Sequence, residues 1–126
     1  METEDKELLL KDLCARLPYD TMVHGVYAHQ NFDFDTVLTL SDIEWFQMCV
    51  AEVKPYLFPL SSMTEEQRKN WFKESNVNYD CEFHIEPTIS IDFCHLSIDW
   101  LNAHHFDYRG LIEKGLAIDC TDLKIY

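Results

Sequence analysis

The strongest constraint on the fold is that the hydrophobic period changes along the chain. Residues 4–17, EDKELLLKDLCARL, place apolar side chains three and four positions apart, which predicts an amphipathic helix capped by Thr3. Residues 79–86, YDCEFHIE, and residues 89–93, ISIDF, alternate apolar and polar side chains, which predicts two strands joined by a short turn. Both periods in one chain predict an α+β fold with a mainly antiparallel sheet, packed by three to five helices.

Two further segments extend this order of elements. Residues 23–40 are rich in β-branched and aromatic side chains on either side of a polar HQNFD turn, so they predict a β-hairpin. Residues 42–53 leave two alternatives open. A capping box of Ser41 with Glu44 favours a helix, whereas the apolar run WFQMCV also fits a third strand.

Prolines mark the middle of the chain. Pro55 and Pro59 in KPYLFPLSS remove backbone donors, which predicts a packed connector rather than a strand. The segment SSMTEEQRKNWFKES then predicts a helix through about Lys73. Two overlapping capping boxes could begin this helix: Ser62 with Glu65, and Thr64 with Gln67.

The stretch AHHFDYRG, residues 103–110, carries the side chains of a possible metal or acid-base site. Imidazole and carboxylate groups from His104, His105 and Asp107 are suitable zinc or iron ligands. Adjacent histidines on a helix point about 100° apart, however, so these two do not readily bind one ion. We therefore predict the end of a helix that begins near Leu96, and neither a metal ion nor a cofactor.

The neighbours of these histidines predict how that helix end packs. Phe106 and Tyr108 are expected to pack against the sheet, and Arg109 to pair with Asp107 or Asp99, a pair that adds only about 0 to 1 kcal/mol if it is exposed. After Gly110, the LIEK segment predicts a short helical turn that stops at a glycine with a left-handed backbone, Gly115. No GxSxG, HExxH, GxGxxG or phosphate-loop pattern is present, so the sequence predicts no catalytic residue.

The formal charge of −13 is concentrated in two stretches of the chain. Residues 17–53 and residues 74–108 contain acids but no lysine or arginine, while acids and bases balance elsewhere. Such a field repels nucleic acid and attracts basic protein surfaces. Acidity that serves only solubility is the alternative.

Length and termini predict one domain over residues 1–126, without a membrane span. Apolar residues make up 47% of the chain, which is enough for a core, but no apolar run approaches the roughly 18 residues of a transmembrane helix. The N-terminal METEDKELLL is acidic, unlike a signal peptide, so a cytoplasmic protein is expected. Five unpaired thiols are then predicted to be reduced and mostly buried: Cys14, Cys49, Cys81, Cys94 and Cys120.

Three stretches together resemble a known family. KELLLKDLCARLPYDTMVHG, VKPYLFPLSSMTEEQ and DWLNAHHFDYRGLIEKGLAI are similar to segments of short, uncharacterised proteins encoded by gut Bacteroidales and by their phages and mobile elements. The family's usual glycine after LPY is replaced here by Asp20. The resemblance implies a small accessory protein of a bacterium or phage and supplies no catalytic residue.

Charge and context together predict a non-enzymatic module that binds a basic protein partner. In a sharper form of this hypothesis, the acidic surface imitates nucleic acid and inhibits a host defence or DNA-handling protein. The alternatives are an accessory protein that binds through apolar surface and, less favoured, a small carboxylate- or metal-dependent enzyme. The predicted binding residues are carboxylates on strand faces: Asp33, Asp35, Asp80, Glu82, Glu86 and Asp92.

Overall fold

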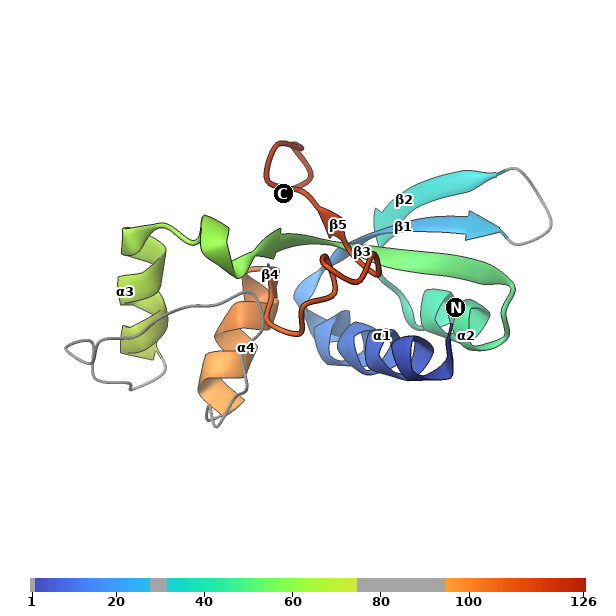
Figure 1. The fold of residues 1–126 in the computed structure, drawn as a ribbon, viewed down its shortest axis with the longest axis horizontal. Helices are drawn as coiled ribbons and strands as arrows, with labels where there is room; N and C mark the ends of the chain where they lie inside the picture. The colour runs from blue at the N-terminus through green and yellow to red at the C-terminus, as the bar shows by residue number, and fades with distance from the viewer. Residues whose placement is uncertain (1, 28–31, 75–94) are drawn as a thin grey trace.

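The computed structural model describes residues 2–27, 32–74 and 95–126, which form an α+β fold with a mixed sheet (Figure 1). The sheet order is β2-β1-β3-β4, and β5 also pairs with β3. The helices are α1 (Thr3–Arg16), α2 (Leu40–Gln47), α3 (Glu65–Glu74) and α4 (His95–Ala103). The strands are β1 (Met22–Tyr27), β2 (Asp33–Val37), β3 (Ala51–Pro59), β4 (Phe106–Asp107) and β5 (Ile118–Asp119). The predicted fold class is confirmed.

Helices α1 and α2 cover one face of the sheet, which we call the inner face. Leu9 and Leu13 of α1 are fully buried, as the helical period predicts. The helix starts one residue earlier than expected, because Glu2 is its N-cap and Thr3 lies within the helix. Apolar side chains from both helices, the strands and the C-terminal segment form this core: Leu9, Leu13, Val23, Leu38, Ile43, Phe46, Ala51, Val53, Leu57, Leu111, Leu116 and Ala117.

The predicted hairpin is confirmed and sets the outer face of the sheet. Strand β1 pairs antiparallel with β2 and with β3, so His24 lies opposite Asp35 on one side and Lys54 on the other. Directly opposite residues share a face of a sheet. On the inner face, the ring of Phe34 lies against Gly25 so closely that a Cβ there would overlap it.

The predicted connector KPYLFPLSS is instead mostly the central strand, β3. Strand β3 pairs with β1 as far as Pro55, then with β5 through Tyr56 and Leu57, and with β4 through Phe58 and Pro59. The prolines lie at the last position of the β1 ladder and at the last residue of the strand. Missing donors are tolerated at such positions, which is why two prolines do not prevent this strand.

Of the two alternatives for residues 42–53, the helix is right as far as Gln47, whereas the run WFQMCV is not a strand. The helix α2 ends at Gln47, and strand β3 begins at Ala51. Between them Cys49 adopts a left-handed backbone with φ 59°, which reverses the chain. The helix is capped by Thr39 and Asp42 in a reciprocal capping box, not by the predicted Ser41 with Glu44, which lie inside the helix.

A second core lies between α3, α4 and the end of β3. It comprises Leu60, Met63, Trp71, Trp100, Leu101, Phe106 and Tyr108.

The remaining local predictions have mixed outcomes. Of the two predicted capping boxes, Thr64 with Gln67 precedes α3, with reciprocal hydrogen bonds of 2.8 and 3.1 Å. Gly115 has the predicted left-handed backbone, φ 73°, at the end of a turn that is not helical. The strands predicted over residues 79–86 and 89–93 lie outside the described residues.

Within the described ranges, no helix is long and apolar enough to cross a membrane.

Candidate functional site

The two predicted binding carboxylates that the structure describes, Asp33 and Asp35, lie on the outer face of β2. Their side chains are 70% and 52% exposed. They flank one imidazole: Asp35 Oδ1 lies 2.8 Å from His24 Nδ1, and Asp33 Oδ2 lies 3.5 Å from His24 Nε2. The predicted residues Asp80, Glu82, Glu86 and Asp92 lie outside the described residues.

Tyr56 of β3 completes this group, which we call the outer-face cluster: His24, Asp33, Asp35 and Tyr56. The Tyr56 hydroxyl donates a hydrogen bond of 2.6 Å to Asp35 Oδ1. The register explains the arrangement, because Asp35 pairs with His24 across β1 and β2 and Tyr56 follows two residues after Lys54. Three strands therefore contribute to one polar cluster on a face that α1 and α2 do not cover.

Hydrogen bonds fix the protonation state of two members of this cluster, Asp35 and Tyr56. Donation from Tyr56 and from His24 lowers the pKa of Asp35 below its usual value. Burial and the hydrogen bond to Asp35 raise the pKa of Tyr56 to about 12. Asp35 therefore stays ionised and Tyr56 stays protonated across the physiological range. An ionised carboxylate held in place by hydrogen bonds is suited to accepting hydrogen bonds from a cation.

Removing the tyrosine hydroxyl should raise the pKa of Asp35. In Tyr56→Phe the largest cause of the lowered pKa is absent, so the pKa of Asp35 should move up toward the usual carboxyl value. Because the pKa of Asp35 is lower in the folded protein than in the unfolded chain, its ionised carboxylate stabilises the folded state at pH values above the ordinary carboxyl pKa. This stabilisation is lost as the pH falls through the lowered pKa of the folded state. An NMR titration of the Asp35 carboxyl carbon measures the shift. An unchanged pKa would show that the hydroxyl does not donate to Asp35.

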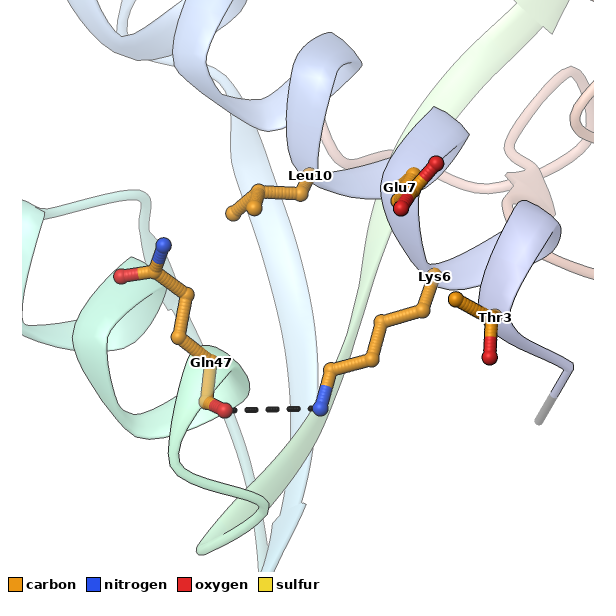
Figure 2. A pocket seen from close by; sticks show the side chains of 5 residues that line it. All are labelled: Thr3, Lys6, Glu7, Leu10 and Gln47. Atoms are coloured by element: carbon orange, nitrogen blue, oxygen red, sulfur yellow. Dashed lines mark hydrogen bonds between the residues drawn. The ribbon is translucent and has the colours of Figure 1, made fainter.

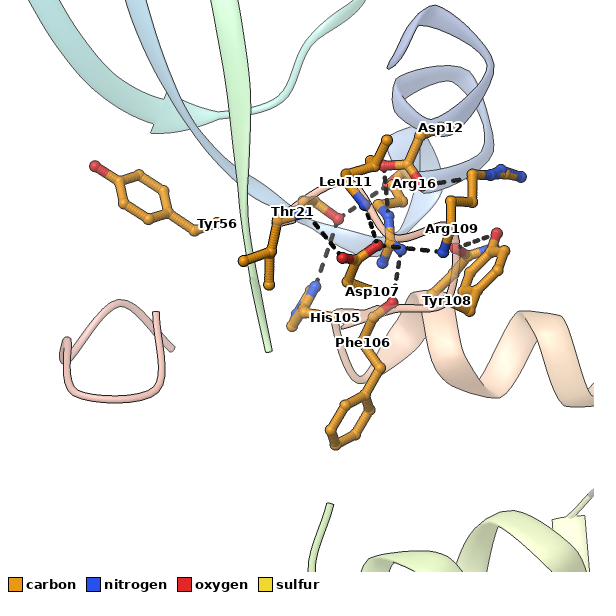
Figure 3. A network of polar contacts seen from close by, with 12 residues as sticks. Asp12, Arg16, Thr21, Tyr56, His105, Phe106, Asp107, Tyr108, Arg109 and Leu111 are labelled. Carbon is orange, nitrogen blue, oxygen red and sulfur yellow. Dashed lines mark hydrogen bonds and ion pairs between the residues drawn. The ribbon is translucent and has the colours of Figure 1, made fainter. Parts of the chain in front are cut away.

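The AHHFDYRG stretch is a structural element in which buried charges hold the chain together (Figure 3). Arg16 of α1 is fully buried; its Nε lies 2.8 Å from Asp12 Oδ2, and its Nη2 donates 2.6 Å to the Phe106 carbonyl. Its guanidinium also stacks on the Tyr108 ring, 5.2 Å from the ring centroid. Phe106 and Tyr108 are buried in the second core, where Phe106 contacts Phe58 of β3. These contacts of Arg16 join helix α1 to the chain that follows α4.

The predicted pairing of Arg109 with Asp107 or Asp99 is wrong, because its side chain lies against Asp12. Arg109 Nε lies 3.6 Å from Asp12 Oδ1, and its guanidinium stacks on Tyr108. Asp107 is 3% exposed and instead accepts backbone hydrogen bonds from Arg109, Leu111 and Ile112. A carboxylate that accepts several amide hydrogen bonds fixes the path of the chain around it, here the turn after β4.

The two histidines have different surroundings at the end of α4. His104 is exposed, with its ring stacked on Trp100 at 3.9 Å, whereas half-buried His105 stacks on Tyr126 at 3.8 Å. His105 has a left-handed backbone, φ 63°, so the helix ends here as predicted. In the described part of the chain, no three His, Cys, Asp or Glu side chains are grouped to hold a metal ion.

His105 should make the protein less stable in mild acid. Burial, reinforced by the nearby Arg16 charge, lowers its pKa from 6.5 to about 4. The unfolded chain therefore binds a proton more readily, and stability present above pH 6.5 falls as the pH drops toward about 4. Urea unfolding of the wild type and of His105→Gln between pH 4 and pH 7 measures this. The variant should lose less stability over that range, and parallel pH profiles would contradict the assignment.

An open groove of about 310 Å³ lies between α1 and the end of α2 (Figure 2). Lys6 spans it, and its Nζ lies 3.4 Å from the Gln47 carbonyl and 2.9 Å from Cys49 Sγ. The other residues lining the groove are Thr3, Glu7 and Leu10.

Cys14 and Cys49 are exposed, which contradicts their predicted burial, while Cys120 is buried as predicted.

Comparisons with protein-family models, with curated proteins and with solved structures found no match to this chain.

Proposed function

We propose that this protein is a binding module for a basic protein surface, and that the outer-face cluster is part of the contact. The observation that supports this most is the position of Asp33 and Asp35, exposed and adjacent on a sheet face without a covering helix. The ionised Asp35 and the fixed Tyr56 hydroxyl form a preorganised acceptor site. A lysine or arginine side chain of a partner supplies the donors that such a site binds.

The geometry favours recognition of single basic side chains over imitation of a nucleic acid backbone. Asp33 and Asp35 both point to His24, and Lys54 pairs with His24 from the other strand. These two acids therefore do not form an evenly spaced row of unpaired charges like that of a phosphate backbone. The nucleic-acid-like form of the proposal depends on Asp80, Glu82, Glu86 and Asp92. As part of the same proposal, the protein serves as an accessory protein of a bacterium, phage or mobile element.

The test is retention of partners from a bacterial lysate by the immobilised protein at low salt, read by mass spectrometry. Asp33→Asn/Asp35→Asn should lose the retained basic proteins. The matched control, Glu113→Gln/Asp122→Asn, removes the same charge from exposed positions elsewhere and should keep them. Retention should also fall steeply between about 20 and 150 mM salt. Equal losses in both variants, or retention independent of both, would refute a site at the outer-face cluster.

A further inference from the structure

Among the described strands, β2 lies at the edge of the sheet and pairs with β1 alone (Figure 1). We call the side of β2 that faces away from β1 the free edge. Exposure alternates along the strand, and Asp33, Asp35 and Val37 are its exposed residues. The edge of a sheet presents unpaired backbone groups, which are a template for pairing with a strand of another chain.

The register shows which backbone groups point out from the free edge. The Leu38 amide donates a hydrogen bond of 2.8 Å to the Thr21 carbonyl, which makes this a hydrogen-bonded pair next to the last pair of the β1–β2 ladder. Hydrogen-bonded and non-hydrogen-bonded pairs alternate along an antiparallel ladder. Counting back from Leu38, the non-hydrogen-bonded positions of β2 are Asp33, Asp35 and Val37. The N–H and C=O groups of these three residues therefore point away from β1 and into the free edge.

The acids of β2 indicate the charge of a strand that fits this edge. Asp33 and Asp35 are 70% and 52% exposed on the outer face. His24 and Lys54, on β1 and β3, lie on the side of these acids that is away from the free edge. A residue of an added strand directly opposite an aspartate lies on the same face, with its Cβ about 4.5–5.5 Å away. A lysine or arginine at that position pairs with the aspartate.

The inner face of β2 indicates which residues lie between those bases. Phe34 is half-buried on this face, and the neighbouring Phe32 is 55% exposed. A residue opposite Phe34 in an added strand is in contact with an aromatic ring, so an apolar side chain fits there. The matching strand therefore alternates basic and apolar residues. Two β2 strands from two copies of this chain would instead bring Asp33 and Asp35 of both copies together on one face, and like charges at facing positions are destabilising.

We propose that the free edge of β2 takes up an extended segment of a partner protein as an added antiparallel strand, with bases opposite Asp33 and Asp35 and an apolar residue opposite Phe34. This inference rests on the proposed function and deepens it, because it gives the conformation in which the basic partner binds. Backbone hydrogen bonds to the edge supply affinity, and the paired side chains select the basic sequence.

The probe is a synthetic peptide of about seven residues that alternates lysine and valine, compared with its glutamate and valine counterpart. In titration calorimetry against the whole protein, the lysine peptide should bind and the glutamate peptide should not. Hydrogen exchange followed by NMR locates the contact. The amides of Asp33, Asp35 and Val37 should exchange rapidly in the free protein and slowly in the presence of the lysine peptide.

Backbone methylation of the peptide tests strand pairing without changing its charge. The amides of lysines opposite Asp33 and Asp35 face β2 in the added strand, whereas the amides of the valines between them face away. N-methylation of the lysine amides should therefore weaken binding on the order of ten-fold. N-methylation of the valine amides is the matched control and should leave binding unchanged.

On the protein side, Val37→Pro removes one donor from the free edge. Proline is tolerated in an edge strand where the N–H faces away from the sheet, so the pairing of β2 with β1 is kept. The variant should weaken lysine-peptide binding about five-fold, whereas Val37→Thr keeps the amide and the branched Cβ and should bind normally. Circular dichroism confirms that both variants are folded.

The outcomes separate this inference from the proposed function. If neither methylation of the lysine amides nor Val37→Pro weakens binding, but Asp33→Asn/Asp35→Asn does, strand pairing is wrong and the acidic contact stands. If the edge amides are protected by the peptide but the double aspartate variant binds equally well, the basic partner is wrong and the proposed function fails with it.

Three further results would overturn the inference. The first is a lysine peptide that does not bind, or a glutamate peptide that binds equally. The second is slow exchange of the Asp33, Asp35 and Val37 amides in the free protein, which would show that the edge is already covered. The third is protection of these amides that increases with protein concentration, which would assign the edge to a second copy of the chain.

Discussion

Replacing Arg16 with alanine is expected to lower the free energy of unfolding by about 3–5 kcal/mol, the cost of leaving one member of a buried ion pair without its partner. Asp12 and Arg16 are both fully buried. Among the described residues, the variant leaves the Asp12 carboxylate with the 3.6 Å contact to Arg109 alone, and it removes the donor to the Phe106 carbonyl. Urea denaturation followed by circular dichroism measures the change.

Two control variants test the cause of this loss. Lys11→Ala removes the same charge from an exposed position of α1 and should change stability by no more than about 0.5 kcal/mol. Asp12→Asn/Arg16→Met removes both charges, keeps an acceptor for Arg109 and refills the space. This double variant should be more stable than Arg16→Ala. If Arg16→Ala were as mild as Lys11→Ala, the buried pair would not be what joins α1 to the chain after α4.

The sequence contains a signal for this buried pair. Asp12 and Arg16 occupy the same helical stripe as Leu9 and Leu13, since positions 9, 12, 13 and 16 follow the period of a single helix face. A charged pair four residues apart within an apolar stripe predicts a buried ion pair. Its partner at Phe106 was not predictable, because that contact joins residues 90 positions apart.

Local patterns predicted the elements, but the site depends on register. Helix α1 and the β1–β2 hairpin follow from side-chain period and turn composition, and the shared face of Asp33 and Asp35 follows from their spacing. Their contact with His24 requires the strand register, which no local pattern gives. Tyr56 was missed because Pro55 and Pro59 suggested a connector, although prolines at the ends of strand ladders are compatible with a sheet.

The aromatic residues Phe32 and Phe34 of the β1–β2 hairpin show the same limit in another form. Phe32 and Phe34 alternate with Asp33 and Asp35, a pattern that assigns aromatic and acidic side chains to opposite faces of β2. The sequence does not reveal that the aromatic face stays exposed at this end. That exposure depends on where α2 ends, and a helix over residues 42–53, one of the two alternatives that the sequence leaves open, would have reached further.

Replacing Asp107 with alanine should destabilise the protein by about 3 kcal/mol, because three backbone donors lose one acceptor. Its carboxylate accepts from the amides of Arg109 at 3.2 Å, Leu111 at 3.1 Å and Ile112 at 3.0 Å. A buried donor left without a partner costs about 1–3 kcal/mol. The total should lie below the sum, since Arg109 and Ile112 are only half-buried and water can reach their amides.

Exposure distinguishes this turn from a similar one nearby. Asp119 accepts from the Thr121 amide at 2.9 Å, but at an exposed position, so Asp119→Ala should cost less than about 1 kcal/mol. Asp107→Asn keeps one oxygen and turns an NH₂ toward a backbone donor, so its loss should fall between the two alanine variants. Urea unfolding gives the order, and amide hydrogen exchange at Leu111 should accelerate most in Asp107→Ala. If Asp107→Ala and Asp119→Ala lower the free energy of unfolding equally, burial is not the reason for the importance of Asp107. The stretch AHHFDYRG would then again be a candidate functional site.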